Sequence, residues 1–284
     1  MASDVAAFIE FTKKAIELGQ DEIVTMTPTS VEITDLDGKP VTPKKYEISW
    51  DASAAQKGGF AHFMLKEIFE QPKAVADTLI GRLSDNNQIV LDELHMSAAE
   101  IRSLKKITVI ACGTAYHAGM VAKYAIEKWA KIPVDVEIAS EFRYRDPIID
   151  PSTLIIAISQ SGETMDTLMA VRHAKAAGGR VLAICNTNSS TIPRESDAVL
   201  YTHAGPEIAV ASTKALLTQI IAVYLIGLHL GQVNGSLKDS EVHDLYKELL
   251  ELPGKIEQIL ETVEPLRELT RTFAQNNTVL FLGR

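Results

Sequence analysis

Residues 154–168 read LIIAISQSGETMDTL, and this stretch decides the fold class. A continuous apolar run such as LIIAI is typical of a strand that is buried on both faces of a parallel sheet. The polar segment SQSGET follows it directly, and Met165, Leu168 and Met169 then recur at helical spacing. A strand, a short loop and a helix in this order form one unit of a parallel α/β fold.

The same pattern recurs along the chain. Short runs rich in Val and Ile predict further strands in ITVIACG, VDVEIAS, RVLAICN and AVLYTH. Helical spacing lies between several of them, as in 164–177, where Gly178 and Gly179 are expected to stop the helix. Alternating strands and helices of this length predict a parallel sheet with helices on both faces.

Residues 1–50 follow another pattern. SDVAAFIEFTKKAIEL predicts a short helix behind a Ser-Asp cap. EIVTMT, SVEITDLDGK and YEISW alternate apolar and polar residues, which predicts antiparallel strands with a turn at Asp37-Gly38. We expect a small antiparallel α+β piece, followed by a polar linker that begins with DASAAQKGG (51–59).

Helical spacing also covers FAHFMLKEIFEQPKAVADTLIGRL, which Pro72 interrupts, and 240–262, which Pro253 interrupts. The apolar segment ALLTQIIAVYLIGLHLG (215–231) is short for a membrane span and contains polar residues, so 212–231 is predicted to be a buried core helix. NNTVLFLGR, at 276–284, predicts the start of another buried strand.

The bulk composition excludes several classes of protein. The 284 residues are 46% hydrophobic and 23% charged, which is ordinary for a globular chain. A net charge of −9 without basic clusters argues against nucleic acid and against anionic membranes. The two cysteines, Cys112 and Cys185, have no metal-ligand or disulfide spacing and are expected to pack as small apolar residues. This use of cysteine predicts a reduced, cytoplasmic setting, and the N-terminus does not read as a signal peptide. We expect no metal and no cofactor.

Three strand ends carry unusual residues: ACGTAYH (111–117), SQSGET (159–164) and EIAVASTK (207–214). Ligands of open parallel sheets bind at such carboxyl ends, where helix N-termini offer unpaired N–H groups and partial positive charge. Hydroxyls at Ser159, Ser161 and Thr164 suit a phosphate, Gly162 permits close approach of the backbone, and Gln160 can bind a sugar hydroxyl.

Capping is the alternative to ligand binding at each loop. A single hydroxyl would cap a helix, so the three hydroxyls in SQSGET favour anion binding there. In the first loop, packing of Cys112 and an N-cap at Thr114 explain the residues equally well, and His117 beside it is expected to have a surface or packing role. Caps explain Ser212 and Thr213 at least as well as ligand contacts do. No G-x-G-x-x-G after a strand, P-loop or nucleophile elbow is present.

The segments ACGTAYHAGMVAKY, VEIASEFRYRDPIID, ISQSGETMDTL, AICNTNSSTIPRESD and EIAVASTKALLTQ, in this order, resemble the sugar isomerase (SIS) domain of the glucosamine-6-phosphate synthase family. The resemblance covers essentially the whole chain. It implies a three-layer αβα, flavodoxin-like SIS domain at 73–275, preceded by the end of an Ntn-type glutaminase domain at 1–50 and a linker at 51–72. Residues 276–284 would then begin a second SIS domain.

The family makes glucosamine 6-phosphate from fructose 6-phosphate and ammonia released from glutamine, as a glutamine–fructose-6-phosphate transaminase (isomerizing). The resemblance implies a site for fructose 6-phosphate, glucosamine 6-phosphate or glucose 6-phosphate, and a homodimer to which the apolar helix 212–231 could contribute surface. The sugar-phosphate-binding residues that it implies are Cys112, Gly113, Thr114, Ala115, Ser159, Gln160, Ser161, Thr164 and Val210, with Gly162, Glu207, Ala211 and Ser212 as further candidates.

Two departures from the family matter. The chain starts with Met1-Ala2 rather than a catalytic cysteine, and the family's Schiff-base lysine and proton-transfer residues have no counterpart in it. Lys214 lies in a matched motif without being that lysine, and Ala115 stands where some members have serine. No catalytic residue is therefore assigned, and the chain alone is expected to bind sugar phosphate without catalysis.

Two other functions remain open on the sequence. One is a non-enzymatic sugar-phosphate sensor, which would normally carry a DNA-binding helix-turn-helix that residues 1–50 do not resemble. The other is a standalone aldose–ketose phosphate isomerase, whose acid–base residues could only be Glu163, His117 and Glu207.

Overall fold

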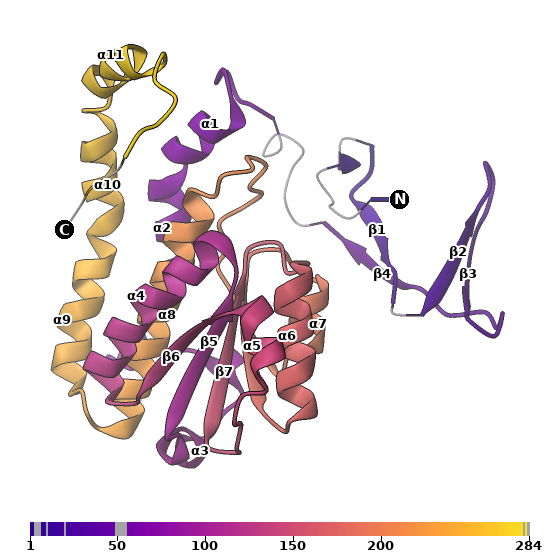
Figure 1. Cartoon of the computed structure of the whole chain (residues 1–284), viewed down its shortest axis with the longest axis horizontal. Coiled ribbons are helices and arrows are strands. Elements are labelled where there is room, and N and C mark those ends of the chain that lie inside the picture. Colours follow the sequence, from indigo (N-terminus) through magenta and orange to yellow (C-terminus); the bar gives the residue numbers. More distant parts are fainter. Residues whose placement is uncertain (3–6, 10, 20, 49–55, 281, 283–284) are drawn as a thin grey trace. The chain divides into compact units, whose positions relative to one another are not determined.

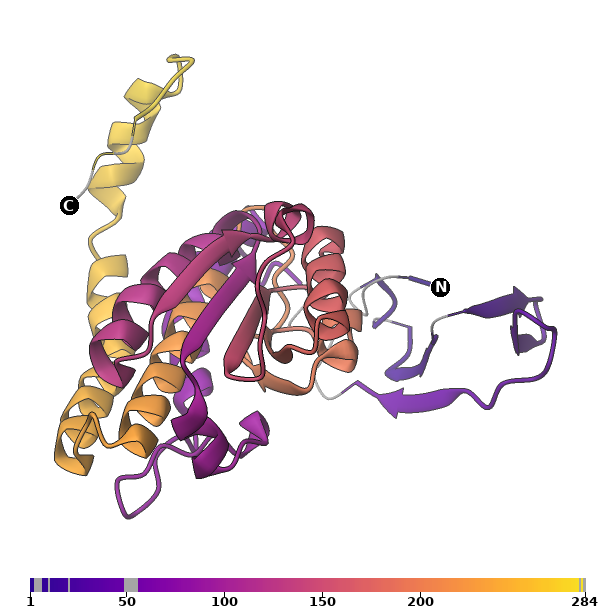
Figure 2. The same ribbon diagram turned by 60° about the horizontal axis from the view of Figure 1, so that its bottom comes forward.

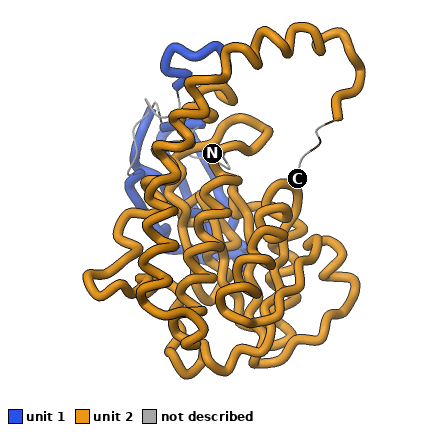
Figure 3. Tube along the Cα trace, turned by 90° about the vertical axis from the view of Figure 1, so that its left-hand side faces the viewer, with its two compact units in different colours: residues 1–61 blue, residues 62–284 orange. Residues whose placement is uncertain are grey.

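The computed structural model describes residues 1–284 except 3–6, 10, 20, 49–55, 281 and 283–284. The described chain forms two compact units, residues 1–61 and residues 62–284 (Figure 3). Parts of four predictions lie outside the described residues, namely of the N-terminal helix, the strand YEISW, the linker and the C-terminal strand.

Unit 1 is built from two antiparallel strand pairs. Their strands are β1 (Lys14–Glu17), β2 (Glu22–Met26), β3 (Val31–Asp35) and β4 (Lys44–Glu47), with β1 paired to β4 and β2 to β3. Ile9, Ala15 and Ile48 form a small apolar cluster. The antiparallel piece is therefore confirmed.

The helix predicted to run through Leu18 is wrong at its C-terminal half. Lys14–Glu17 is a strand, because its backbone pairs with β4 in the register Ala15 opposite Tyr46. Ala15 is buried between two neighbours that are exposed, which is the period of a strand. Helical spacing over so short a segment was outweighed by tertiary pairing.

Unit 2 contains the predicted parallel sheet. Its strands are β5 (Lys106–Ala111), β6 (Val134–Ile138), β7 (Thr153–Ser159), β8 (Arg180–Cys185) and β9 (Ala198–Tyr201). They lie in the order β6-β5-β7-β8-β9, and all four neighbouring pairs are parallel.

Helices cover both faces of this sheet (Figures 1 and 2). They are α1 (Phe63–Phe69), α2 (Gln71–Leu79), η3 (Asp92–Leu94), α3 (Ala98–Ser103), α4 (Gly113–Ala130), α5 (Ala139–Arg145), α6 (Met165–Ala176), α7 (Thr191–Glu195), α8 (Lys214–Asn234), α9 (Asp239–Leu250), α10 (Leu252–Leu260) and α11 (Glu264–Phe273). One face packs against α4 and α8, and the other against α5, α6 and α7. The three-layer αβα prediction is confirmed.

The middle strand β7 shows why its sequence is apolar throughout. Every residue from Thr153 to Ser159 is buried. Ile156 and Ile158 belong to the core beside α4 and α8, whereas Ile155 and Ala157 belong to the core beside α6. A strand covered on both faces has no solvent side, so alternation disappears from its sequence.

Helix α8 is the core helix predicted for 212–231, shifted to 214–234. By length and composition it is the one described helix that could cross a membrane, but 61% of its most apolar window is buried inside the protein. Its apolar surface therefore packs within its own domain, against α4 and the sheet. The homodimer to which this helix could contribute surface stays a prediction.

The strand predicted at the C-terminus does not form in the described part of 276–284. Residues 276–280 pair with no described strand, and Val279 and Leu280 are exposed. Without a neighbouring edge an apolar run has no hydrogen-bonding partner for a ladder. The predicted breaks at the two prolines are confirmed, since α2 follows α1 at Pro72 and α10 follows α9 at Pro253.

Candidate functional site

The candidate site lies where successive strand connections change direction along the sheet. The chain leaves β5 through α4 to β6 on one side, and then returns through α5 to β7 on the other side of β5. Helix α4 therefore covers one face and α6 the opposite face (Figure 1). The strand ends lie side by side, with Ala111 opposite Ile158. Such a switch point is where open α/β sheets bind ligands.

A direct contact joins the two loops at this point. The Thr167 hydroxyl, in the first turn of α6, lies 3.8 Å from Cys112 Sγ at the start of α4. Cys112 is half-buried. Cys185, at the end of β8, is fully buried as predicted, and burial raises the pKa of its thiol. Both are free thiols.

Neither helix at the switch point has a side-chain cap. The N-cap residues are Cys112 for α4 and Thr164 for α6, and neither side chain bonds a helix amide. The first amides of a helix have no intrahelical acceptor, so both N-termini present N–H groups at the loops. Gly113 and Thr114 are exposed there, whereas Ala115 is buried. The cap predicted as the alternative at Thr114 is not formed, because the N-cap position falls on Cys112.

The loop 159–164 is organised by its own hydroxyls. Ser159 Oγ accepts the Gly162 N–H at 3.0 Å and lies 3.0 Å from Thr164 Oγ1. Ser161 Oγ accepts the Glu163 N–H at 3.2 Å, and Gln160 and Ser161 are half-buried. The hydroxyls thus tighten the turn and leave the α6 amides open.

Gly162 is required at its position in two ways. Its φ of +68° is in the left-handed region, and a Cβ there would lie 2.0 Å from Ser190 Oγ. Ser190 belongs to the segment after β8 and donates its hydroxyl to the Thr187 carbonyl at 2.8 Å. The two loops are therefore packed in contact at the glycine.

Glu163 does not face the α6 N-terminus. Its Oε1 accepts the Thr191 N–H at 2.8 Å and the Thr191 hydroxyl at 3.1 Å, so it caps α7. The backbone carbonyl of Gln160 also accepts the Asn186 N–H at 3.1 Å. The segment 186–191 thus supports the loop 159–164. This support was not among the predictions from the sequence. The signal was present in NTNSST, another polar run that directly follows a buried strand.

The third loop, 207–213, leads into α8. Glu207 Oε1 accepts the N–H groups of Thr213 and Ala215 at 2.9 and 3.1 Å, and its Oε2 accepts the Ser212 hydroxyl. Glu207 therefore caps α8, and Ser212 Oγ accepts the Leu216 N–H at 3.2 Å, whereas the Thr213 side chain, at the N-cap position, bonds no helix amide. Val210 and Ala211 are exposed. Two of the three acid–base candidates for a standalone isomerase, Glu163 and Glu207, are therefore occupied in helix caps.

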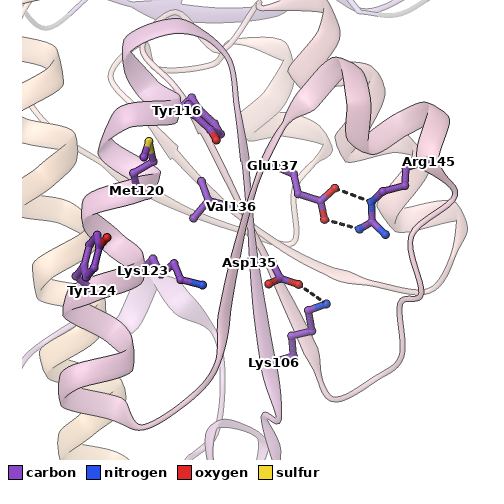
Figure 4. Close-up of a pocket in the computed structure, with 9 residues that line it drawn as sticks. All are labelled: Lys106, Tyr116, Met120, Lys123, Tyr124, Asp135, Val136, Glu137 and Arg145. Atoms are coloured by element: carbon purple, nitrogen blue, oxygen red, sulfur yellow. Dashed lines mark hydrogen bonds and ion pairs between the residues drawn. The ribbon is translucent and has the colours of Figure 1, made fainter.

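A separate hollow of about 490 Å³ lies between α4 and the edge strand β6 (Figure 4). Lys106 Nζ lies 2.7 Å from Asp135 and lowers the pKa of that carboxyl, and Arg145 binds Glu137 through two hydrogen bonds. Lys123 Nζ donates to the Val134 carbonyl at 2.7 Å. Because these cations already have partners, the hollow offers an anion little, and the switch-point loops remain the candidate site.

Comparison with known proteins finds a domain family that matches the middle of the chain. Residues 100–228 match the family model of the SIS domain. Over its full length the chain is similar to glutamine–fructose-6-phosphate aminotransferases (isomerizing). It is 60% identical to that of Streptomyces coelicolor and 55% identical to that of Corynebacterium glutamicum, each over 284 residues and 100% of this chain. The family resemblance is confirmed.

Solved structures share the fold of this chain. The C-terminal domain of glucosamine-fructose-6-phosphate aminotransferase from Francisella tularensis has a TM-score of 0.75 at 41% identity, covering 81% of this chain and 64% of that chain. A putative phosphosugar isomerase from Clostridium difficile shares the fold, with a TM-score of 0.62 at 18% identity over 74% of this chain and 57% of that one. The chain spans 46% of the length of the curated relatives named above.

Proposed function

We propose that this chain is the sugar-phosphate-binding part of a glutamine–fructose-6-phosphate aminotransferase (isomerizing), and that it binds fructose 6-phosphate at the switch point. The observation that carries the proposal is the meeting of two uncapped helix N-termini, of α4 and α6, beside the hydroxyls of Ser159 and Thr164. Similarity to the aminotransferases over the whole chain supports the same substrate class.

The phosphate would lie on the loop 159–164. There the α6 amides and the hydroxyls of Ser159, Ser161 and Thr164 offer donors without any lysine or arginine in the loop. The sugar would extend toward Gly113 and Thr114 of α4 and toward Val210. The remaining predicted residues, Cys112, Ala115, Gln160, Gly162, Glu207, Ala211 and Ser212, would then line or shape this site.

Calorimetric titration tests the proposal. We expect saturable binding of fructose 6-phosphate and loss of at least about tenfold in affinity in Ser159→Ala with Thr164→Val, since hydrogen bonds to a charged group contribute about 1.5–3 kcal/mol each. The matched control is Ser152→Ala with Thr153→Val, which makes the same changes at the amino end of the same strand. A wild-type chain that is folded by circular dichroism and binds no sugar phosphate would refute the proposal.

Catalysis by the chain alone is not part of the proposal. Glu163 and Glu207 are engaged in caps, and His117 is exposed on α4, so the loops carry no acid–base pair that faces the proposed sugar. We expect no glucosamine 6-phosphate from fructose 6-phosphate and ammonia. Detection of that product by mass spectrometry, with the purified chain as the sole protein, would contradict this expectation.

The sensor and the standalone isomerase remain alternatives without a specific observation in their favour. A homodimer and a cytoplasmic setting complete the proposal. Light scattering of the purified chain measures the first, and fractionation of expressing cells measures the second.

A further inference from the structure

The third loop at the sheet edge is held by a carboxylate from a distant helix. Glu67 of α1 is 2% exposed, and its Oε1 accepts the N–H groups of Ile208 at 2.6 Å and Ala209 at 3.2 Å. Its Oε2 also lies 3.2 Å from the Ala209 nitrogen. A buried carboxylate needs such donors, because an unpaired one would be very costly. These contacts fix the backbone immediately before Val210.

A second carboxylate, on the residue directly after α1, fixes the chain immediately after the loop. Glu70, at the end of α1, lies 2.6 Å from the Nζ of Lys214, the first residue of α8. Lys214 is 2% exposed, and the other Glu70 oxygen lies 3.3 Å from Lys66 Nζ. Glu207 caps the same helix from within the loop. The segment is therefore anchored on both sides of its exposed residues.

The anchored loop lies at the same edge of the sheet as the proposed phosphate loop. Both α4 and α8 follow strands of one parallel sheet and pack side by side, so their first turns lie at the carboxyl edge (Figure 1). The backbone N–H of Asn186 donates to the Gln160 carbonyl, and its side-chain amide donates to the Gly205 carbonyl at 2.6 Å. This bond ties the chain just before the third loop to the segment that supports the phosphate loop.

The anchoring of the loop around the exposed side chain of Val210 points to a role in ligand binding. Val210 is fully exposed, although Ala209 before it bonds the buried Glu67, and the buried Lys214 after it bonds the half-buried Glu70. A loop that merely connects β9 to α8 has no need of a buried carboxylate from a helix about 140 positions away in sequence. Such support is expected where a loop must keep one conformation for a ligand.

We propose that Glu67 is a positioning residue, which holds the backbone of 208–212 in the conformation that contacts the sugar. Glu70 and Lys214 extend the same support to the start of α8. The inference rests on the proposed function, and it makes α1, which precedes the SIS domain, part of the sugar site. The phosphate itself lies on the separate loop 159–164, so the support acts on sugar contacts and not on phosphate contacts.

This separation gives the test a readout that general destabilisation would not produce. The chain 1–284 is titrated with fructose 6-phosphate and, separately, with inorganic phosphate. In Glu67→Ala we expect affinity for fructose 6-phosphate to fall about tenfold or more, while affinity for phosphate changes less than about twofold. Glu67→Gln keeps one acceptor oxygen for the two amides and should show an intermediate loss.

The matched control is Asp197→Ala. Asp197 also accepts a backbone N–H, from Val181 at 2.8 Å, and pairs with Lys175 at 2.8 Å, but it lies at the amino edge of the sheet. This variant should bind both ligands as the wild type does. Hydrogen exchange provides a second measurement, in which the Ile208 and Ala209 amides should exchange faster in both Glu67 variants.

The outcomes separate the two proposals. Wild-type chain that binds no sugar phosphate overturns the proposed function and this inference with it. Wild-type chain that binds fructose 6-phosphate, together with Glu67 variants that bind it equally well or lose both ligands in parallel, overturns the inference alone. If Glu67→Ala does not fold, Glu67→Gln decides, with unchanged exchange and unchanged sugar affinity counting against the inference.

Discussion

Gly162→Ala is the substitution whose effect follows most directly from the structure. An alanine at φ +68° costs about 1–2 kcal/mol by the steric argument for left-handed conformations. Its Cβ would also lie 2.0 Å from Ser190 Oγ, so that hydroxyl must move and lose its bond to the Thr187 carbonyl, which contributes about 0.5–1.5 kcal/mol. We expect a loss of about 2–3 kcal/mol in the free energy of unfolding.

Gly178→Ala is the matched control. Its φ of +83° is equally unfavourable for alanine, but no atom lies within 4 Å of the added Cβ. We expect it to lose only this conformational cost of about 1–2 kcal/mol. Urea unfolding followed by circular dichroism measures both, and Gly162→Ala with Ser190→Gly should recover part of the difference, because the obstructing side chain is gone.

Binding adds an independent measurement. Displacement of the turn at Gly162 moves the α6 N-terminus relative to the hydroxyls, so Gly162→Ala should weaken fructose 6-phosphate binding and Gly178→Ala should not. If the two variants unfold at the same urea concentration and bind the ligand equally, the packing argument for the loop is wrong.

Three further changes have defined outcomes. Burial lowers the pKa of His229 below its ordinary value of 6.5. Below pH 6.5 the folded chain therefore binds fewer protons than the unfolded chain, and it loses stability as the pH falls. The urea midpoint of His229→Gln should vary less between pH 7 and pH 5 than the midpoint of the wild type. The hydrogen bonds of Arg172 hold the pKa of Glu195 below its ordinary value of 4.5, so this pair stabilises the fold above pH 4.5 and the contribution is lost as the pH falls further. Acid titration of Glu195→Gln should therefore show a shallower loss of stability below pH 4.5 than wild type, and an identical acid limb would contradict this. Glu163→Ala frees the first turn of α7 and should weaken phosphate binding severalfold in calorimetry, whereas unchanged affinity would mean that this contact does not support the loop.

The parallel sheet could be predicted from the sequence because its strands are buried on both faces. Runs such as LIIAI have few alternatives once helices of ordinary length separate them. The strand ends that carry the site followed from the same argument, since the polar residues after β5 and β7 mark their carboxyl ends.

Side-chain direction could not be predicted in the same way. Glu163 and Glu207 stand in the site motifs, yet their carboxylates bond helix amides of α7 and α8. Glu67 gave no signal at all, because its partners are backbone groups about 140 residues away, and backbone donors leave no trace in the sequence. The misassigned helix near Lys14 has the same origin, a pairing with distant β4.

The charged hollow beside β6 has a consequence for how the chain behaves at high concentration. β6 is an edge strand, and unpaired edges can add strands from other molecules and start aggregates. Asp135 and Glu137, fixed by Lys106 and Arg145, place bulky ion pairs along that edge. An incoming strand would have to strip these pairs of water and displace them, which disfavours the addition of a further strand at β6.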